Sequence, residues 1–166
     1  MSSLNTLTTL VQAFGAGTIN VAKGLGLNFR VDRKGAGPGI RANSSCAAAV
    51  IGVVGDELKG SVTLLTDKGA FTDIIRTMSG GMIKEPSTND NLSMSALGEL
   101  ANMICGSAMK EAARLKVGRF DITPPQMFTG ENLKSVPSDD PRVKYYTIPL
   151  VDDKEAASVY IVLGFR

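Results

Sequence analysis

The chain has 166 residues, of which 43% are hydrophobic and 20% are charged, a composition typical of a folded globular domain and not of a disordered chain. Its formal net charge of +2, with no compact Lys/Arg run, argues against a nucleic-acid or membrane-surface binder. It has no histidine, which excludes a Ser-His-Asp triad, a Cys-His pair and the common histidine-containing metal sites.

The sequence also gives no indication of a membrane span, a signal peptide, a disulfide framework or a zinc site. The longest apolar run, Cys46–Val54, has about half the length of a membrane span. The N-terminus lacks a basic region followed by an apolar one, so we expect no signal peptide and a cytoplasmic location. Two cysteines, Cys46 and Cys105, make neither a disulfide framework nor a zinc site, and we expect both to be small buried hydrophobes.

The first half of the chain predicts a helix, a loop, a hairpin and a second helix. Apolar residues recur at helical spacing over residues 4–23. Residues 32–45 are rich in Gly, Ser, Asn and basic residues and indicate a loop with a possible edge segment before it. Cys46–Val54 and Ser61–Thr66 flank a polar turn, which indicates a hairpin. A helix over 68–79, ended by two glycines, follows.

The second half predicts one long helix and three strands. A polar connector over 84–92 leads into a helix over 93–116. The predicted strands are Arg119–Thr129, Val143–Val151 and Ala157–Phe165, with a loop over 130–142 and a final turn at Asp152-Asp153-Lys154. Proline has no N–H for a sheet ladder, so Pro124-Pro125 places the first of these strands at an edge or near a bulge.

The order of these elements predicts the fold class. Strands come in hairpins and do not alternate with single helices, which favours an α+β fold with a mostly antiparallel sheet and helices packed on it. No stretch has the composition of a linker, so we expect one domain over residues 1–166. A helix followed by a strand pair occurs near residue 20 and again near residue 110, a weak internal repeat.

The predicted helix over 93–116 has an ordinary inner face and an unusual outer face. Its apolar stripe consists of Leu97, Ala101, Ile104, Ala108, Ala112 and Leu115. The opposite side carries Ser95, Glu99, Asn102, Gly106, Lys110 and Ala113. A solvated helix face normally carries several long polar side chains, and Gly106 costs roughly 1 kcal/mol of helix propensity relative to Ala. Small residues around Glu99 and Asn102 would let another protein surface approach the helix closely.

This helix resembles a known family. The spacing Ser95-x-x-x-Glu99-x-x-Asn102 matches the Asp/Ser-x3-Glu-x2-Asn pattern of the CheC, CheX and FliY phosphatases of bacterial chemotaxis. The string from Leu97 to Ala108 is similar to CheX-like members in particular. So is the proline-containing segment from Ile122 to Gly130, and the resemblance covers roughly residues 10–165. The first helix offers only Gly17-Thr-Ile-Asn20, with glycine in place of the acid, so a second site there looks degenerate.

The resemblance implies a protein phosphatase that hydrolyses the aspartyl phosphate of a CheY-type response regulator. By this analogy Asn102 orients the attacking water and Glu99 pairs with a lysine of the regulator, while Ser95, Met103 and Gly106 contact it. Met103 and Met109 are more simply explained by packing against neighbouring elements. No cofactor of its own is implied, because the regulator supplies Mg²⁺. CheX-like members are homodimers joined at sheet edges, so we expect a homodimer with contributions from strands within 119–165.

Two other hypotheses stay open at this point. The chain could be a non-catalytic module of the same fold that binds a response regulator or acts as a scaffold. It could also be an α+β domain that binds a small molecule through Gly35–Gly39, although this segment lacks the ending of a phosphate loop. A phosphate-release assay separates the first alternative, and thermal stabilisation by a ligand independent of Glu99 and Asn102 separates the second.

Overall fold

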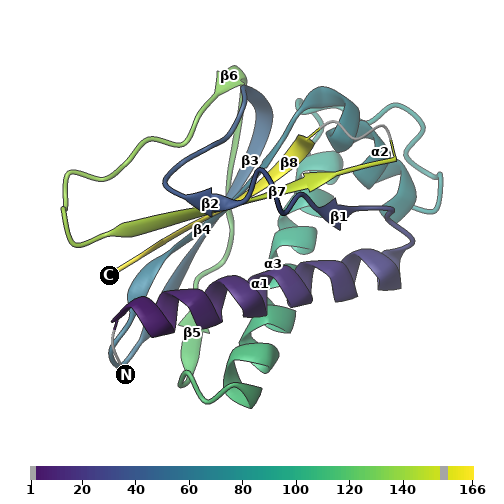
Figure 1. Cartoon of the computed structure of the whole chain (residues 1–166). Helices are drawn as coiled ribbons and strands as arrows, with labels where there is room; N and C mark the ends of the chain where they lie inside the picture. The colour runs from purple at the N-terminus through teal and green to yellow at the C-terminus, as the bar shows by residue number, and fades with distance from the viewer. Residues whose placement is uncertain (1–2, 154–156) are drawn as a thin grey trace.

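The structure is a computed structural model that describes residues 3–153 and 157–166. It is an α+β fold in which one antiparallel sheet of eight strands carries three helices on one face (Figure 1). The predicted fold class is confirmed. Of the predicted final turn, Lys154 lies outside the described residues.

The helices lie close to their predicted positions. Helix α1 spans Ser3–Leu25, α2 spans Lys68–Met78 and α3 spans Asn91–Arg114. Gly80 and Gly81 follow α2 with φ of 61° and 82°, and their N–H groups bond to the carbonyls of Thr77 and Arg76. This is the predicted glycine end of the helix, because only glycine adopts such angles without strain.

The sheet has two hairpins at its centre and two strands at each edge. The hairpins are β3 (Ser45–Gly55) with β4 (Lys59–Thr66), and β7 (Lys144–Val151) with β8 (Ala157–Phe165). The order is β1-β7-β8-β4-β3-β5. The short strands β1 (Arg30–Val31) and β2 (Gly37–Pro38) both pair with β7, and β5 (Phe120–Ile122) and β6 (Gln126–Leu133) both pair with β3.

Strand structure is present in the region predicted over 119–129, but the prediction of one continuous strand is wrong. The chain breaks at residues 123–125 into β5 and β6, because Pro124 and Pro125 cannot donate to the ladder. Thr123 takes over at the break, and its Oγ1 accepts the Gly52 N–H at 2.8 Å. β6 also continues to Leu133, so the loop predicted over 130–142 begins after it.

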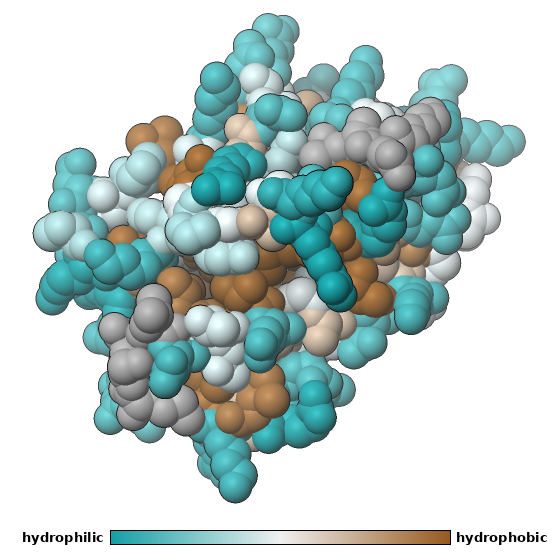
Figure 2. Space-filling view, viewed as in Figure 1, coloured by the Kyte–Doolittle hydropathy of each residue, from teal (hydrophilic) through white to brown (hydrophobic). Residues whose placement is uncertain are grey.

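The main core lies between the sheet and the helices. All three helices contribute to it, with Phe14 from α1, Phe71 from α2 and Leu97 from α3 each at most 4% exposed. A second, smaller cluster on the other face joins Ala48, Leu65, Tyr160 and Val162. On the side of the molecule that carries α1, apolar surface is visible along and beside this helix (Figure 2). The last turn of α1 contains one basic residue, Lys23, and its first turn contains no acidic residue.

Candidate functional site on helix α3

The two faces predicted for α3 are present. Of the predicted apolar stripe, Leu115 is half-buried at the C-cap, and the other five residues are buried: Leu97, Ala101, Ile104, Ala108 and Ala112. On the opposite side Ser95, Glu99, Lys110 and Ala113 are exposed, while Asn102, Met103 and Gly106 are half-buried. At about 100° per residue, Glu99 and Asn102 lie roughly 60° apart around the helix axis, and one turn separates them along it. The structure therefore places an acid and an amide next to each other on an accessible surface.

The start of α3 is fixed by a cap that the sequence prediction missed. Asp90 accepts hydrogen bonds from the N–H groups of Leu92 and Ser93 at 3.3 and 3.0 Å, and from the Ser93 hydroxyl at 2.7 Å. The Ser93 hydroxyl, followed by its N–H, lowers the pKa of the Asp90 carboxyl below its ordinary value. Aspartate is a preferred N-cap residue, so its position just before the helix was an available signal.

Strand β6 supports α3 directly beside Glu99. A Cβ placed on Gly98 would lie 3.1 Å from Met127 Sδ and 3.4 Å from Pro125 Cγ. Gly98 is buried, and the lack of a side chain there lets the start of β6 approach the helix backbone. Because Gly98 and Asn102 are four residues apart, they lie on the same side of α3, one turn apart. The contact with β6 thus lies at the helical turn that carries both predicted residues.

Gly106 has no internal reason to be glycine. A Cβ placed on it would have no neighbouring atom within 4 Å, and its backbone is helical. Glycine in a helix interior costs roughly 0.8–1.0 kcal/mol relative to alanine. No neighbour among the described residues requires that cost, and the lack of a side chain at Gly106 leaves the helix surface low there.

A sequence profile of the family described as chemotaxis phosphatase CheX matches residues 47–148, more than half of the chain. The chain belongs to the CheX family. The matched segment includes α3 with Glu99 and Asn102, and β6 with Met127.

The CheY-P phosphatase CheX of Thermotoga maritima is a curated relative of this CheX-family chain, 35% identical over 85 residues. That alignment spans 51% of this chain and 52% of the relative, so it covers about half the length of each protein.

Solved structures show the fold along nearly the whole chain. CheX of Vibrio vulnificus superposes with a TM-score of 0.77 at 22% identity, over 95% of this chain and 99% of that one. CheX of Borrelia burgdorferi, in a CheX–CheY–BeF3–Mg²⁺ complex, superposes with a TM-score of 0.74 at 19% identity, over 94% and 97%. Identities this low support the shared fold alone.

Helix α1 cannot carry a second copy of the motif. At Gly17, where the acid would stand, an added Cβ would lie 2.8 Å from the Ala108 backbone nitrogen of α3. Gly17 is buried at the contact between the two helices, whereas Glu99 is exposed. Asn20 is exposed, and α1 contains no acidic residue to pair with it. The degenerate half-site predicted from the sequence therefore has a packing reason as well.

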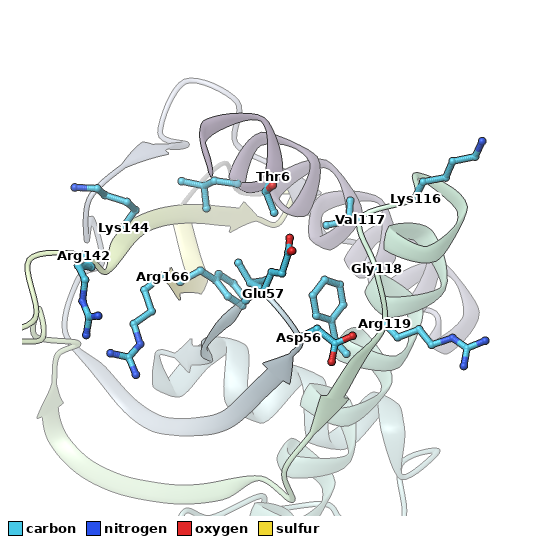
Figure 3. Close-up of a pocket in the computed structure, with 14 residues that line it drawn as sticks. Thr6, Asp56, Glu57, Lys116, Val117, Gly118, Arg119, Arg142, Lys144 and Arg166 are labelled. Carbon is cyan, nitrogen blue, oxygen red and sulfur yellow. The ribbon is translucent and has the colours of Figure 1, made fainter. Parts of the chain in front are cut away.

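A hollow of about 540 Å³ lies beyond the C-terminal end of α3 (Figure 3). It is lined by apolar residues, among them Phe120 and Phe165, and by charged residues of both signs. Glu57 projects toward its centre, whereas Lys116 and Arg119 point outward at its rim. Asp140 binds the guanidinium groups of Arg142 and Arg166 at 2.8 Å each, which holds the pKa of the Asp140 carboxyl well below its usual range. The predicted residues of α3 do not line this hollow.

Cysteine and glycine-loop chemistry does not add to the site. Burial raises the pKa of the Cys105 thiol to about 12, and burial followed by the nearby Asp67 charge raises that of Cys46. Neither the large hollow nor a smaller one of about 250 Å³ is lined by Gly35–Gly39. Across residues 3–153 and 157–166, no group of three or more Cys, Asp or Glu side chains is arranged to hold a metal ion. Within the same residues, no helix is long and apolar enough to cross a membrane.

Proposed function

We propose that this chain is a phosphatase for the aspartyl phosphate of a CheY-type response regulator. The observation that carries the proposal is the pairing of exposed Glu99 with half-buried Asn102 on one face of α3, within the segment that matches the CheX family. The relative from Thermotoga maritima, a CheY-P phosphatase, and the Borrelia burgdorferi complex of CheX with CheY support the choice of substrate.

The chemistry asks the chain for positioning more than for acid–base catalysis. A water attacks the phosphorus, the bond from phosphorus to the aspartate oxygen breaks, and a carboxylate and dihydrogen phosphate leave. Asn102 is proposed to hold this water through its side-chain amide, which can both donate and accept hydrogen bonds. Glu99 is proposed to pair with a lysine of the regulator and so fix α3 over the phosphoryl group.

The remaining partner contacts follow from the same face. Ser95, Met103 and Gly106 are proposed to touch the regulator around the central pair. Met109 packs against the main core, as expected, whereas Met103 is half-buried at the edge of the outer face. The Mg²⁺ ion is proposed to come with the regulator, where it would neutralise charge on the phosphoryl oxygens. The complex of the Borrelia burgdorferi relative, which contains CheY and Mg²⁺, supports this source.

The proposal is tested by phosphate release from a CheY-type regulator charged with acetyl phosphate. Wild-type chain should accelerate release, Asn102→Ala should abolish the acceleration while binding persists, and Glu99→Ala should weaken both. Lys34→Glu, on an exposed loop far along the chain from α3, is the control and should behave as wild type. Release by Asn102→Ala at the wild-type rate would show that the assignment is wrong.

The same assay separates the non-catalytic alternative. A scaffold module would bind the regulator's beryllofluoride–Mg²⁺ adduct, a stable stand-in for the phosphorylated form, without changing the rate of phosphate release. In that case Glu99→Ala would weaken binding, whereas Asn102→Ala and wild type would both leave the rate of phosphate release at that of the regulator alone.

A homodimer joined at a sheet edge is part of the proposal. Of the strands within 119–165, β7 and β8 are paired on both sides, so β5 and β6 are the ones at an edge. β6 is almost fully exposed and includes Phe128, which is 48% exposed. An exposed edge of this kind normally needs covering. Light scattering, which measures the molar mass in solution, tests the proposed homodimer, and Phe128→Lys should shift it toward the monomer.

A further inference from the structure

The outer face of α3 extends well beyond Glu99 and Asn102. Leu92 and Lys110 are 18 residues apart, which is five turns of an ideal helix, so they project in the same direction about 27 Å apart. Glu99 lies within about 20° of that direction. The helix therefore presents an apolar side chain, Glu99 and a cation along one line, with Asn102 about 80° to one side of it.

Leu92 is exposed without a role in packing or capping. Its side chain is 64% exposed, and of the large apolar side chains exposed among the described residues it is the one on α3. The cap uses its backbone N–H, which donates to Asp90, and leaves the side chain free. A single exposed leucine is common on protein surfaces. What distinguishes Leu92 is its alignment with Glu99 on the proposed docking face.

Lys110 is an unneutralised charge at the other end of the line. Glu111 and Arg114, also on α3, pair with each other at 2.8 Å. The side chain of Lys110 forms no hydrogen bond or ion pair with any residue that the structure describes. Its ammonium group is therefore available to an acidic group on a partner.

We infer that Leu92 and Lys110 are the two ends of the regulator's footprint and set its orientation on α3. The inference rests on the proposed phosphatase function. A standard interface covers about 800 Å² per partner, a disc roughly 32 Å across, which matches the span of about 27 Å from Leu92 to Lys110. The occupant is the phosphorylated regulator, with an apolar contact opposite Leu92 and an acidic one opposite Lys110.

Charge complementarity supports this occupant. The phosphoryl group adds a charge of about −1.5 to −2 close to Asn102. Lys110 lies about 12 Å from Asn102 along the helix, close to one Debye length at 0.1 M salt. Lys110 should therefore raise the association rate at low ionic strength, and the effect should fade as salt is added.

The experiment measures KM, kcat and their salt dependence with the regulator that the wild-type chain dephosphorylates. Leu92→Ser and Lys110→Glu should each raise KM by about fivefold or more while kcat stays within twofold, because Asn102 still performs the chemistry. Lys110→Glu should also flatten the dependence of kcat/KM on ionic strength. Matched controls are Val136→Ser, 77% exposed on the β6–β7 loop, and Lys34→Glu. Both controls should match wild type.

The two hypotheses fail in different ways. If the wild-type chain dephosphorylates and Asn102→Ala does not, while Leu92→Ser and Lys110→Glu keep the wild-type KM and salt dependence, the footprint is overturned and the function stands. An equal rise in KM for the two controls overturns it as well. If the wild-type chain accelerates nothing, the proposed function fails first. Binding of the beryllofluoride–Mg²⁺ adduct then tests the footprint alone, and equal affinity for wild type and both variants overturns it.

Discussion

Replacing Gly106 by alanine should make this protein more stable and less active. A Cβ at this position would have no neighbour within 4 Å, so the new methyl group causes no internal clash. Alanine is favoured over glycine in a helix interior by about 0.8–1.0 kcal/mol. For a chain of this length, such a gain corresponds to a rise of roughly 2–4 °C in Tm, measurable by differential scanning calorimetry.

The same methyl group should obstruct the regulator. Gly106 lies one turn beyond Asn102 on the outer face, where the proposed interface packs closely. Forcing a methyl group into a well-packed contact costs about 1–3 kcal/mol, which corresponds to a loss of roughly 5- to 150-fold in kcat/KM. The assay is phosphate release from the phosphorylated regulator, with wild type and variant compared at equal concentrations of folded protein.

Gly15 on α1 provides the matched control. It also lies within a helix, is half-buried, and would have no neighbour within 4 Å of an added Cβ. Gly15→Ala should raise Tm by a similar amount and leave the rate of phosphate release unchanged. If Gly106→Ala raised Tm but dephosphorylated as fast as wild type, the requirement for a low surface at Gly106 would be refuted. If it lowered Tm, the space above Gly106 would be occupied and the structural reasoning itself would be wrong.

Two further predictions concern how α3 is held. Met127→Ala removes the β6 side chain that packs on Gly98 beside Glu99. This variant should lower kcat by about tenfold or more with little change in KM, because a small displacement of the helix that positions the reacting groups greatly slows the reaction. Met127→Leu should restore kcat, and Leu133→Ala, the other half-buried residue of β6, should leave it unchanged; a tenfold loss for Leu133→Ala would instead indicate a general effect of the strand. The cap at Asp90 predicts a pH dependence: since its pKa is lowered in the folded state, its stabilisation is fully present above the unfolded value of about 3.9 and is lost as pH falls through the lower folded value. The Tm difference between wild type and Asp90→Ala should therefore be constant from pH 7 to 5 and shrink in more acidic buffer, and a difference that grew on acidification would contradict the assignment.

Much of the fold could be predicted because its elements carry strong periodic signals. The hairpins β3–β4 and β7–β8 follow from apolar runs separated by polar turns, and α1 and α3 from apolar spacing of three and four residues. Boundaries shifted by about two residues, as at Asn91, because the cap and not the apolar pattern decides where a helix begins. The break between β5 and β6 was predicted only as an edge or bulge, since a proline pair shows where a ladder stops but not where pairing resumes.

The sequence by itself determined which residues share the outer face of α3, because helical geometry is local and Glu99 and Asn102 are three residues apart. It also excluded histidine chemistry, since the chain has none. Only the tertiary structure decided what lies beneath and around that face. At Gly98 there is no room for a side chain because Met127 of β6 packs on it, and at Gly17 because α3 packs on it. At Gly106 an added Cβ would have no neighbouring atom within 4 Å. These three glycines look alike in the sequence and differ in what the rest of the fold brings against them, which is a property of long-range packing and not of local pattern.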